Sequence, residues 1–465
     1  MADHAIHRGS QAGPRLSVAR GGDTIAAAAT APGRGAIGII RISGPEAAAI
    51  GRAIGGRELT PRHAHHAPFI DATGRIIDRG LVIFFPAPGS FTGEDVVELQ
   101  GHGGRWVMDL LLGRVLELGA RPARPGEFSE RAFRNGRIDL AQAEAIADLI
   151  DAGTATAARS AAAALQGEFS ARVTALAAAI DRLRAECEAA IDFADDDLPP
   201  DLCEDHRHRA LLLTEAADRL LNGARHGALL RDGLRVVIAG RSNAGKSSLL
   251  NHLVGRERAI VSPIAGTTRD TVEVEADIGG VPVHLTDTAG LRDAGEEIER
   301  EGMRRARTAV AAADEVLLVV PDGEPLGDED LSLIGELKGD TRCIIVRNKI
   351  DLTGTPAGVA AGAHGTEVCI SATEGLGTDL LRAELLRAAG VATEATGGEF
   401  AARRRHLEAL RLVRACVAEA GLEAGTAELM AEWLRQARSH LDTITGATTT
   451  EDLLAEIFAG FCIGK

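Results

Sequence analysis

One segment of the 465-residue chain limits its fold more than any other. The buried-type strand LRVVIAG (234–240) runs into GRSNAGKS (240–247) and then into the helical pattern SSLLNHLV. The eight residues 240–247 match G-x-x-x-x-G-K-[ST], a loop in which glycines let backbone N–H groups surround phosphate oxygens. Strand, loop and helix in this order predict a P-loop in a doubly wound α/β sheet.

Three further motifs follow the P-loop, and each comes directly after a strand pattern. DTAG (287–290) follows VPVHLT, NKID (348–351) follows CIIVR, and SAT (371–373) follows CIS. The carboxyl ends of parallel strands meet at one edge of a sheet, so these motifs are expected to lie together. Asp351 can accept two hydrogen bonds from guanine N1–H and the amino group, a pair that adenine lacks. The motifs therefore predict a GTP-hydrolysing enzyme.

The phosphate contacts can be assigned from the same motifs. Lys246 is expected to bridge the β- and γ-phosphates, and Ser247 and Thr268 to bind Mg²⁺, with Asp287 holding the ion through water. The predicted GTP-binding residues are Asn243, Ala244, Gly245, Lys246, Ser247, Ser248, Ser262, Pro263, Ile264, Ala265, Gly266, Thr267, Thr268, Asp287, Thr288, Ala289, Gly290, Asn348, Lys349, Asp351, Ser371 and Ala372.

The residue after DTAG is Leu291, where Ras-type enzymes carry a glutamine. A leucine cannot orient the attacking water. Charge in the transition state must therefore be neutralised by another group, and Asn243 and the acidic run EEIERE (296–301) are the candidates.

Net charge and composition exclude several classes of protein. A net charge of −16 excludes a globally basic surface for nucleic-acid backbones. Local basic runs occur at residues 121–137 and 403–405, and such runs are more often solvated helix faces or loops than binding patches. No apolar run reaches the ~18–20 residues of a membrane span, and the first thirty residues lack a secretory signal pattern. The six cysteines form no CxxC pair, so a cytoplasmic protein with reduced thiols is expected.

The order of patterns predicts a multidomain α/β + α chain. Residues 1–22 lack periodicity and are expected to be a disordered leader. Residues 23–138 mix strand and helix patterns, as in an α+β domain. Residues 139–229 and 392–465 are helical, whereas strands and helices alternate over 230–391. We therefore expect a discontinuous helical domain into which a P-loop GTPase domain is inserted.

Several segments outside the G domain carry a family resemblance. They are APGRGAIGIIRISG, FTGEDVVELQGHGG, RPGEFSERAF, DLAQAEAIADLIDA, RRRHLEAL and the terminal FCIGK. With the GTPase motifs, they make the chain resemble the MnmE (TrmE) family, the GTPases of tRNA wobble-uridine modification, over nearly its whole length from Thr24. Ser242 stands where the family usually has proline, and the leader has no counterpart.

The resemblance implies cofactors and site residues. The N-terminal domain would form a homodimer and bind 5,10-methylene- or 5-formyl-tetrahydrofolate at Arg41, Glu98, Arg137 and Lys465. K⁺ would activate hydrolysis from ligands at Asn243, Ser262, Ile264 and Thr267, Glu299 would orient water, and Cys462 would serve the modification chemistry.

The resemblance also implies partners. The FAD- and NADH-dependent MnmG (GidA) would join the homodimer in a heterotetramer-type complex. Together they would add an aminomethyl or carboxymethylaminomethyl group to C5 of uridine 34 in certain tRNAs.

Simpler interpretations stand beside these. Arg41 and Glu98 could form a structural ion pair, Glu299 could lie on a solvated helix face, and Cys462 could be a small buried hydrophobe. An alternative function is a ribosome-assembly GTPase that binds rRNA without covalent chemistry. Such a protein would usually carry a KH-type GXXG module or a second G domain, and neither pattern appears in the sequence.

Overall fold

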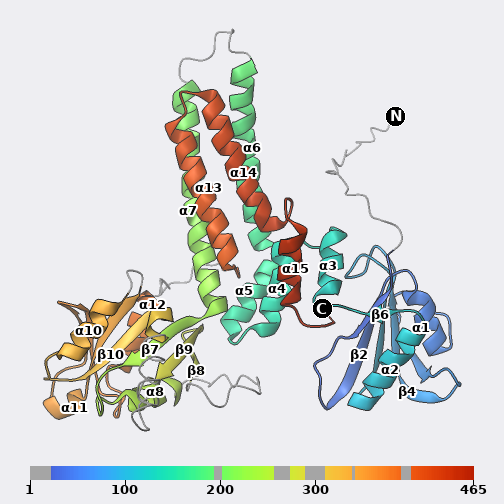
Figure 1. Cartoon of the computed structure of the whole chain (residues 1–465), viewed down its shortest axis with the longest axis horizontal. Coiled ribbons are helices and arrows are strands. Elements are labelled where there is room, and N and C mark those ends of the chain that lie inside the picture. Colours follow the sequence, from blue (N-terminus) through green and yellow to red (C-terminus); the bar gives the residue numbers. More distant parts are fainter. Residues whose placement is uncertain are drawn as a thin grey trace, which may run out of the picture. The chain divides into compact units, whose positions relative to one another are not determined.

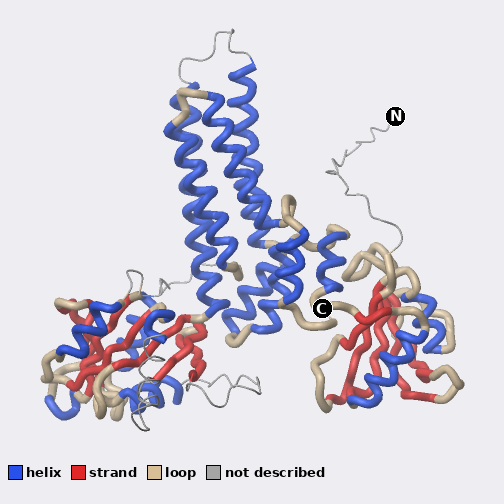
Figure 2. The backbone as a smooth tube through the Cα atoms, in the orientation of Figure 1, coloured by secondary structure: helices blue, strands red, loops and turns tan. Residues whose placement is uncertain are grey.

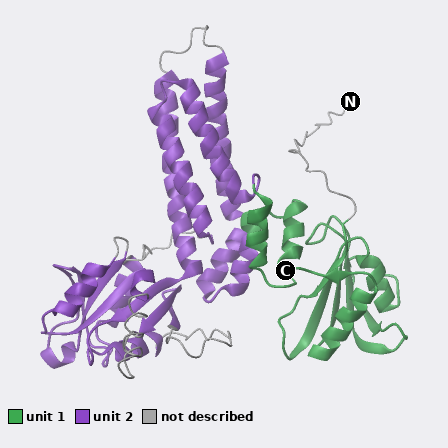
Figure 3. Ribbon diagram, in the orientation of Figure 1, with its two compact units in different colours: residues 1–143, 449–465 green, residues 144–448 purple. Residues whose placement is uncertain are grey.

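The computed structural model describes residues 22–192, 202–255, 273–287, 309–337, 341–388 and 400–464 (Figure 1). The chain divides into two compact units, residues 1–143 with 449–465 and residues 144–448 (Figure 3).

The first unit is an α+β structure built on a six-stranded sheet with strand order β3-β4-β5-β2-β1-β6. The pairs are antiparallel except for β1 with β6. Alternate residues of the strands, such as Ile40, Ile42 and Leu99, are buried under α1 and α2, which explains the apolar alternation of the sequence. Its elements are β1 (Ile25–Ala28), β2 (Gly35–Ser43), α1 (Ala47–Gly55), β3 (His65–Ile70), β4 (Ile76–Phe85), β5 (Val96–Gly103), α2 (Arg105–Glu117), β6 (Arg121–Pro122), α3 (Glu127–Arg134) and α15 (Glu451–Ala459).

Helices dominate one part of the second unit (Figure 2). Two sequence-distant pairs of helices pack together, because α13 contacts α7 and α14 contacts α6. The discontinuous helical domain expected from the sequence is thus present. The long alanine-rich run is divided at Gly167, which has a left-handed φ of 89°. The helices are α4 (Leu140–Asp151, which begins in the first unit), α5 (Ala155–Leu165), α6 (Glu168–Asp192), α7 (Leu202–Asp232), α13 (Arg404–Leu422) and α14 (Ala427–Thr445).

The inserted G domain is a seven-stranded sheet with strand order β12-β13-β11-β10-β7-β9-β8. The five inner strands are parallel, and the edge strands β12 and β8 are antiparallel to their neighbours. Continuous apolar runs such as EVLLVVP form the inner strands, because these are buried on both faces. The elements are β7 (Leu234–Ala239), α8 (Lys246–Gly255), β8 (Glu273–Ile278), β9 (Val281–Asp287), β10 (Glu315–Pro321), α10 (Asp328–Glu336), β11 (Arg342–Asn348), α11 (Ile350–Thr353), β12 (Gly358–Gly362), β13 (Gly365–Ile370) and α12 (Thr378–Ala388).

A buried ionic cluster joins helices α4 and α13. The Arg405 guanidinium donates to both carboxylate oxygens of Glu144, at 2.8 and 2.7 Å, and His406 Nε2 lies 3.0 Å from the same carboxylate. Arg403 donates to Asp148 at 2.7 Å. The expectation that the run 403–405 is a solvated face is therefore wrong for Arg403 and Arg405. It is right for Arg404, which is exposed and pairs with the exposed Glu408.

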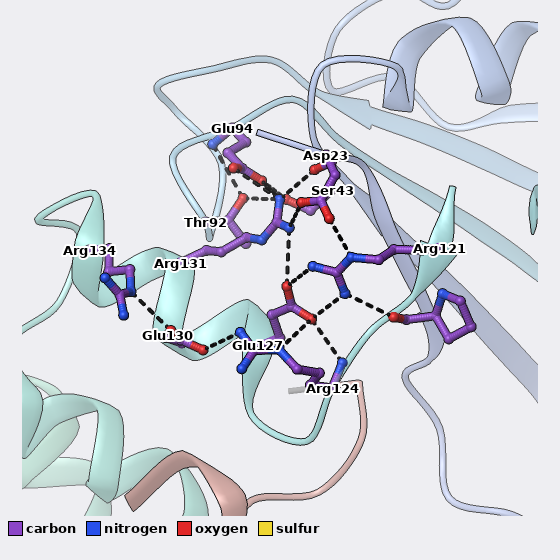
Figure 4. A network of polar contacts seen from close by, with 11 residues as sticks. Asp23, Ser43, Thr92, Glu94, Arg121, Arg124, Glu127, Glu130, Arg131 and Arg134 are labelled. Atoms are coloured by element: carbon purple, nitrogen blue, oxygen red, sulfur yellow. Dashed lines mark hydrogen bonds and ion pairs between the residues drawn. The ribbon is translucent and has the colours of Figure 1, made fainter. Parts of the chain in front are cut away.

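Four of the five arginines in the basic run at 121–137 are paired with carboxylates of the first unit (Figure 4). Glu127 is buried and accepts from Arg121 at 2.9 Å and from Arg131 at 3.2 Å. Burial opposes ionisation of Glu127, but these hydrogen bonds outweigh it and lower its pKa to about 2. Arg131 also pairs with Asp23 and Glu94, while Arg124 and Arg134 pair with Glu130. These four arginines are therefore committed to carboxylates inside the fold.

Glu144 gives a test of the cluster's contribution to stability. Burial opposes its ionisation, but hydrogen bonds from His406 and Arg405 hold its pKa well below the ordinary value of 4.5. Glu144→Gln leaves Arg405 buried without its charge partner, so the free energy of unfolding by urea should fall by about 3–5 kcal/mol at pH 7. The matched Glu408→Gln, which breaks the exposed pair with Arg404, should cost less than about 0.5 kcal/mol.

The same variant predicts a pH dependence. Because the pKa of Glu144 is lowered in the folded protein, its contribution to the free energy of unfolding is complete above pH 4.5. The contribution is lost as the pH falls below that value. The difference between wild type and Glu144→Gln should therefore shrink on acidification. Equal stability of the two proteins at pH 7 would show that the cluster does not stabilise the fold.

Candidate functional site

Close backbone approaches fix the shape of the P-loop. Gly240 and Gly245 have positive φ of 137° and 98°, and Asn243 has φ of 62°. A Cβ atom on Gly240 would lie 2.2 Å from the Val319 carbonyl oxygen, and one on Gly245 would lie 2.2 Å from Asn348 Nδ2. Only glycine fits at these two positions, which is the physical basis of the spacing seen in the sequence.

Lys246 and Ser247 open helix α8 directly after the loop. The Lys246 ammonium is largely buried and donates to the carbonyl oxygens of Gly240 at 2.9 Å and Arg241 at 2.8 Å. Ser247 Oγ donates to Asp287 Oδ2 at 3.1 Å, which joins the P-loop to the start of the DTAG motif. A hydroxyl and a carboxylate side by side are hard oxygen ligands of the kind that Mg²⁺ prefers.

Asn348 connects three of the predicted motifs. Its side-chain nitrogen donates to the Ala244 carbonyl at 2.9 Å, and its side-chain oxygen accepts from the Ala372 amide at 3.0 Å. The adjacent Lys349 donates to the Asn243 carbonyl at 2.7 Å. The structure thus brings the P-loop, NKID and SAT segments together at the carboxyl ends of β7, β11 and β13.

Asp351 and Ser371 complete the base side of the site. Asp351 is exposed in the first turn of α11, where its carboxylate is available to a ligand. Ser371 is fully buried, and its hydroxyl accepts from the Glu374 amide at 3.3 Å. Ser371 therefore braces its own loop, and the backbone of Ala372 is the group that contacts Asn348.

Two supporting residues escaped the sequence prediction. Asp322, just after β10, accepts from Thr353 and Thr355 at 2.5 Å each and so fixes the C-terminal end of α11, the short helix that carries Asp351. Those hydrogen bonds lower the pKa of Asp322. Arg241 in the P-loop donates to the buried Asp330 at 2.8 Å and ties the loop to the start of α10. An aspartate directly after a buried strand, as in VVPD, was the available signal for Asp322.

Several predicted residues lie outside the described parts of the chain. They are Ser262, Pro263, Ile264, Ala265, Gly266, Thr267, Thr268, Thr288, Ala289, Gly290, Glu299 and Lys465, together with Leu291.

A second group of predicted site residues lies in the first unit. Arg41 on β2 and Glu98 on β5 are register partners, and the guanidinium donates to Glu98 Oε1 at 2.9 and 3.1 Å. Arg41 lies over the rings of Phe91 and Phe128, 5.8 and 5.9 Å from their centroids. The pair is mostly but not fully buried, which leaves polar edges for a ligand.

The C-terminal segment reaches this group. Arg41 Nη1 lies 3.4 Å from the Gly464 carbonyl oxygen, and the Cys462 carbonyl accepts from the Gly126 amide at 3.4 Å. Cys462 is exposed, so the interpretation of it as a buried hydrophobe is wrong. Arg137 is exposed and lies beside Gly93, in the same loop as Phe91.

The described residues contain neither a membrane-spanning helix nor a cluster of metal-binding side chains. No helix in them is long and apolar enough to cross a membrane. No three His, Cys, Asp or Glu side chains in the same ranges are arranged to hold a metal ion.

Gly245 gives the sharpest test of the nucleotide site. In Gly245→Ala the added methyl group would collide with the Asn348 amide, so the P-loop and NKID segments would separate. We expect GTP affinity to fall at least ~10-fold, because one or more hydrogen bonds to the phosphates would be lost. In Gly255→Ala, at the end of the same helix, the added methyl group meets no atom of the described residues within 4 Å, so this variant should bind GTP normally. Titration with a fluorescent GTP analogue measures both, and equal affinities would refute this geometry.

The comparisons with known proteins agree with this arrangement. The profile of the MnmE helical domain matches residues 140–462, and that of the GTP-binding protein TrmE N-terminus matches residues 24–137. The chain is 53% identical to the tRNA modification GTPase MnmE of Methylococcus capsulatus, over 95% of this chain and 99% of that protein. It is 52% identical to the protein of the same name from Pseudomonas paraeruginosa, with the same coverage. The chain therefore belongs to the MnmE family and is a GTP hydrolase.

Proposed function

We propose that this GTPase is activated by K⁺ and, with a flavin-dependent partner of the MnmG type, modifies the wobble uridine of certain tRNAs. The product would carry an aminomethyl or carboxymethylaminomethyl group at uridine C5. The observation that carries the proposal is the full-length similarity to proteins named tRNA modification GTPase. Two groups of polar residues support it, the nucleotide motifs around the P-loop in the second unit and the residues around Arg41 in the first.

The nucleotide site would hold GTP and Mg²⁺. Ser247 and Asp287 already lie together, and Thr268 would supply a further oxygen ligand to the ion. Asn348 would hold the P-loop against the base-binding segments, and Asp351 would select guanine. Lys246 would leave its loop carbonyls for the β- and γ-phosphates, which are stronger acceptors because they are charged.

Hydrolysis would rely on K⁺ for the charge that an arginine finger supplies elsewhere. Leu291 cannot orient water, and Glu299 would do so instead. Asn243, Ser262, Ile264 and Thr267 would hold the ion. Asn243 is placed in the P-loop with a left-handed backbone, and its carbonyl is taken by Lys349, so its side-chain oxygen is the atom left to bind a cation.

Tetrahydrofolate would bind the first unit near Arg41. A pterin ring presents an amino group and a ring N–H on one edge, and the Glu98 carboxylate can accept from both. Arg41 would orient the Glu98 carboxylate through its two hydrogen bonds, while Arg137 and Lys465 would offer cations to the acidic part of the ligand. When bound, the folate supplies the one-carbon unit. The exposed Cys462 lies on the terminal segment that contacts Arg41, where its thiol could take part in the transfer.

The chain would work as a cytoplasmic homodimer with its partner. Trp106 and Leu110, one turn apart on α2, are 77% and 58% exposed and are suited to a dimer contact. The arginines of residues 121–134 are paired with carboxylates, and the net charge is −16, so this chain alone would hold tRNA weakly. The partner would supply most of the basic surface and the flavin.

Nucleoside mass spectrometry of tRNA from cells that lack this chain tests the proposal. Modified wobble uridines should disappear and return when the wild-type chain is restored. Unchanged uridines together with accumulating rRNA precursors would refute the proposal and favour the ribosome-assembly alternative.

Dependence on K⁺ is a second test. The rate of GTP hydrolysis should fall at least ~10-fold when NaCl replaces KCl at equal ionic strength, because removal of one charge-stabilising group costs ~10²–10³ in kcat. Asn243→Ala should be slow in both salts. Equal initial rates of the wild type in the two salts would overturn K⁺ activation.

Cys462 separates the two activities. Cys462→Ser should leave GTP hydrolysis within about twofold of wild type, because the residue lies outside every nucleotide motif, and should abolish uridine modification. Cys203→Ser, which changes another exposed cysteine, should affect neither activity. Both are read from hydrolysis assays and tRNA mass spectrometry in complemented cells. Normal modification by Cys462→Ser would show that the thiol takes no part in the modification chemistry.

A further inference from the structure

The β8–β9 hairpin lies between the two segments expected to sense the γ-phosphate. Residues 262–268 come shortly before β8, and β9 ends at Asp287 of DTAG. The Gly279–Gly280 turn joins the two strands at the other end of the hairpin. Each of the two segments is therefore connected in sequence to a strand that leads to this turn.

The turn contacts the beginning of helix α5. Thr154 Oγ1 donates to the Gly280 carbonyl at 3.0 Å. The same oxygen accepts from the Ala157 amide at 3.0 Å and so caps α5. A Cβ atom on Gly280 would lie 2.5 Å from Thr156 Oγ1, which shows that turn and helix touch directly. One buried hydroxyl thus joins the G domain to the helical domain while it orders the first turn of α5.

Both chain crossings between these domains are attached at the same corner. Asp148, in the last turn of α4, accepts from Arg231 and from Arg403 at 2.7 Å each. Arg231 is at the end of α7, just before the chain enters the G domain, and Arg403 caps α13 just after it returns. The contact with the Gly280 turn and the two arginine bonds to Asp148 therefore all lie at the α4–α5 corner, residues 148–161.

The corner also has room to rearrange. A pocket of about 100 Å³, partly open to solvent, lies beside Asp148 and is lined by Ser160, Gly227, Arg231 and Ala401, among others. Ser160 Oγ is buried there without a hydrogen-bond partner among the described residues. Side chains that border such a pocket meet fewer close neighbours on that side, which lowers the steric cost of a shift at the corner.

We propose that Thr154 is a positioning residue that transmits the nucleotide state of the G domain, through the β8–β9 turn, to α5 and the α4–α5 corner. The downstream consequence for tRNA rests on the proposed function, whereas the coupling itself does not. Thr154 belongs to none of the nucleotide motifs, and its two side-chain hydrogen bonds link the turn to the helix.

Two substitutions separate the link from the helix cap. Thr154→Ser keeps the hydroxyl and both hydrogen bonds. Thr154→Asp keeps a good N-cap acceptor, but its carboxylate cannot donate to Gly280 and faces that carbonyl unfavourably. Both are made in the full chain and compared with wild type in KCl, with GDP and with a slowly hydrolysed GTP analogue.

Hydrogen exchange of the first-turn amides of α5, Ala157 and Ala158, is the readout. In wild type and Thr154→Ser the exchange rate should differ between the two nucleotides. In Thr154→Asp that difference should shrink roughly three- to tenfold, because one hydrogen bond between the turn and the helix is lost. The exchange rate with GDP should be unchanged, because the aspartate still caps α5. Hydrolysis should stay within about twofold, and uridine modification in cells should fall.

A purely structural role would change exchange equally in both nucleotide states. That result would overturn the proposal. So would an exchange-rate difference between the two nucleotides that is undiminished in Thr154→Asp, or the absence of such a difference in wild type. These exchange measurements need no tRNA. Loss of the nucleotide difference in Thr154→Asp supports the coupling even if tRNA from cells lacking the chain is normally modified, a result that would refute only the proposed function.

Discussion

The helical domain depends on two buried carboxylates of helix α4, Glu144 and Asp148. They accept hydrogen bonds from arginines on α7 and at the start of α13, which are separated from each other in sequence by the whole G domain. Buried charges are tolerated only when they are paired and hydrogen-bonded, so the segments that carry these arginines have little freedom to pack elsewhere. An inserted domain can leave and re-enter the bundle at one place because this cluster holds both crossings.

Within the G domain, Asn348 plays the corresponding part for the nucleotide site. It holds the P-loop and the SAT loop, and its amide occupies the space that a side chain at position 245 would need. Phosphate-binding and base-binding segments thus share one buried side chain. The group around Arg41 in the other unit is built differently, from a cross-strand ion pair, aromatic rings and the chain terminus. The two groups of residues are therefore chemically distinct.

Much of this could be predicted from the sequence because local rules apply. The P-loop follows from glycine positions that only a tight turn explains, and the parallel strands follow from continuous apolar runs. The charged clusters could not be predicted in the same way. Arg403 and Arg405 resemble a solvated helix face until their partners are known, and those partners lie more than 250 residues away. Exposure of Cys462 likewise depends on where the terminal segment packs, which no local pattern encodes.

If the proposed function is correct, binding and hydrolysis of GTP by the G domain are required for modification of the tRNA. The most direct measurement is the level of modified wobble uridine in cells whose only copy carries Lys246→Ala, beside a matched strain with Gly255→Ala. The Lys246→Ala strain should lose the modification while the Gly255→Ala strain keeps it, since only the first substitution damages phosphate binding. Normal modification in the Lys246→Ala strain would show that phosphate binding by this chain is not needed for the tRNA chemistry.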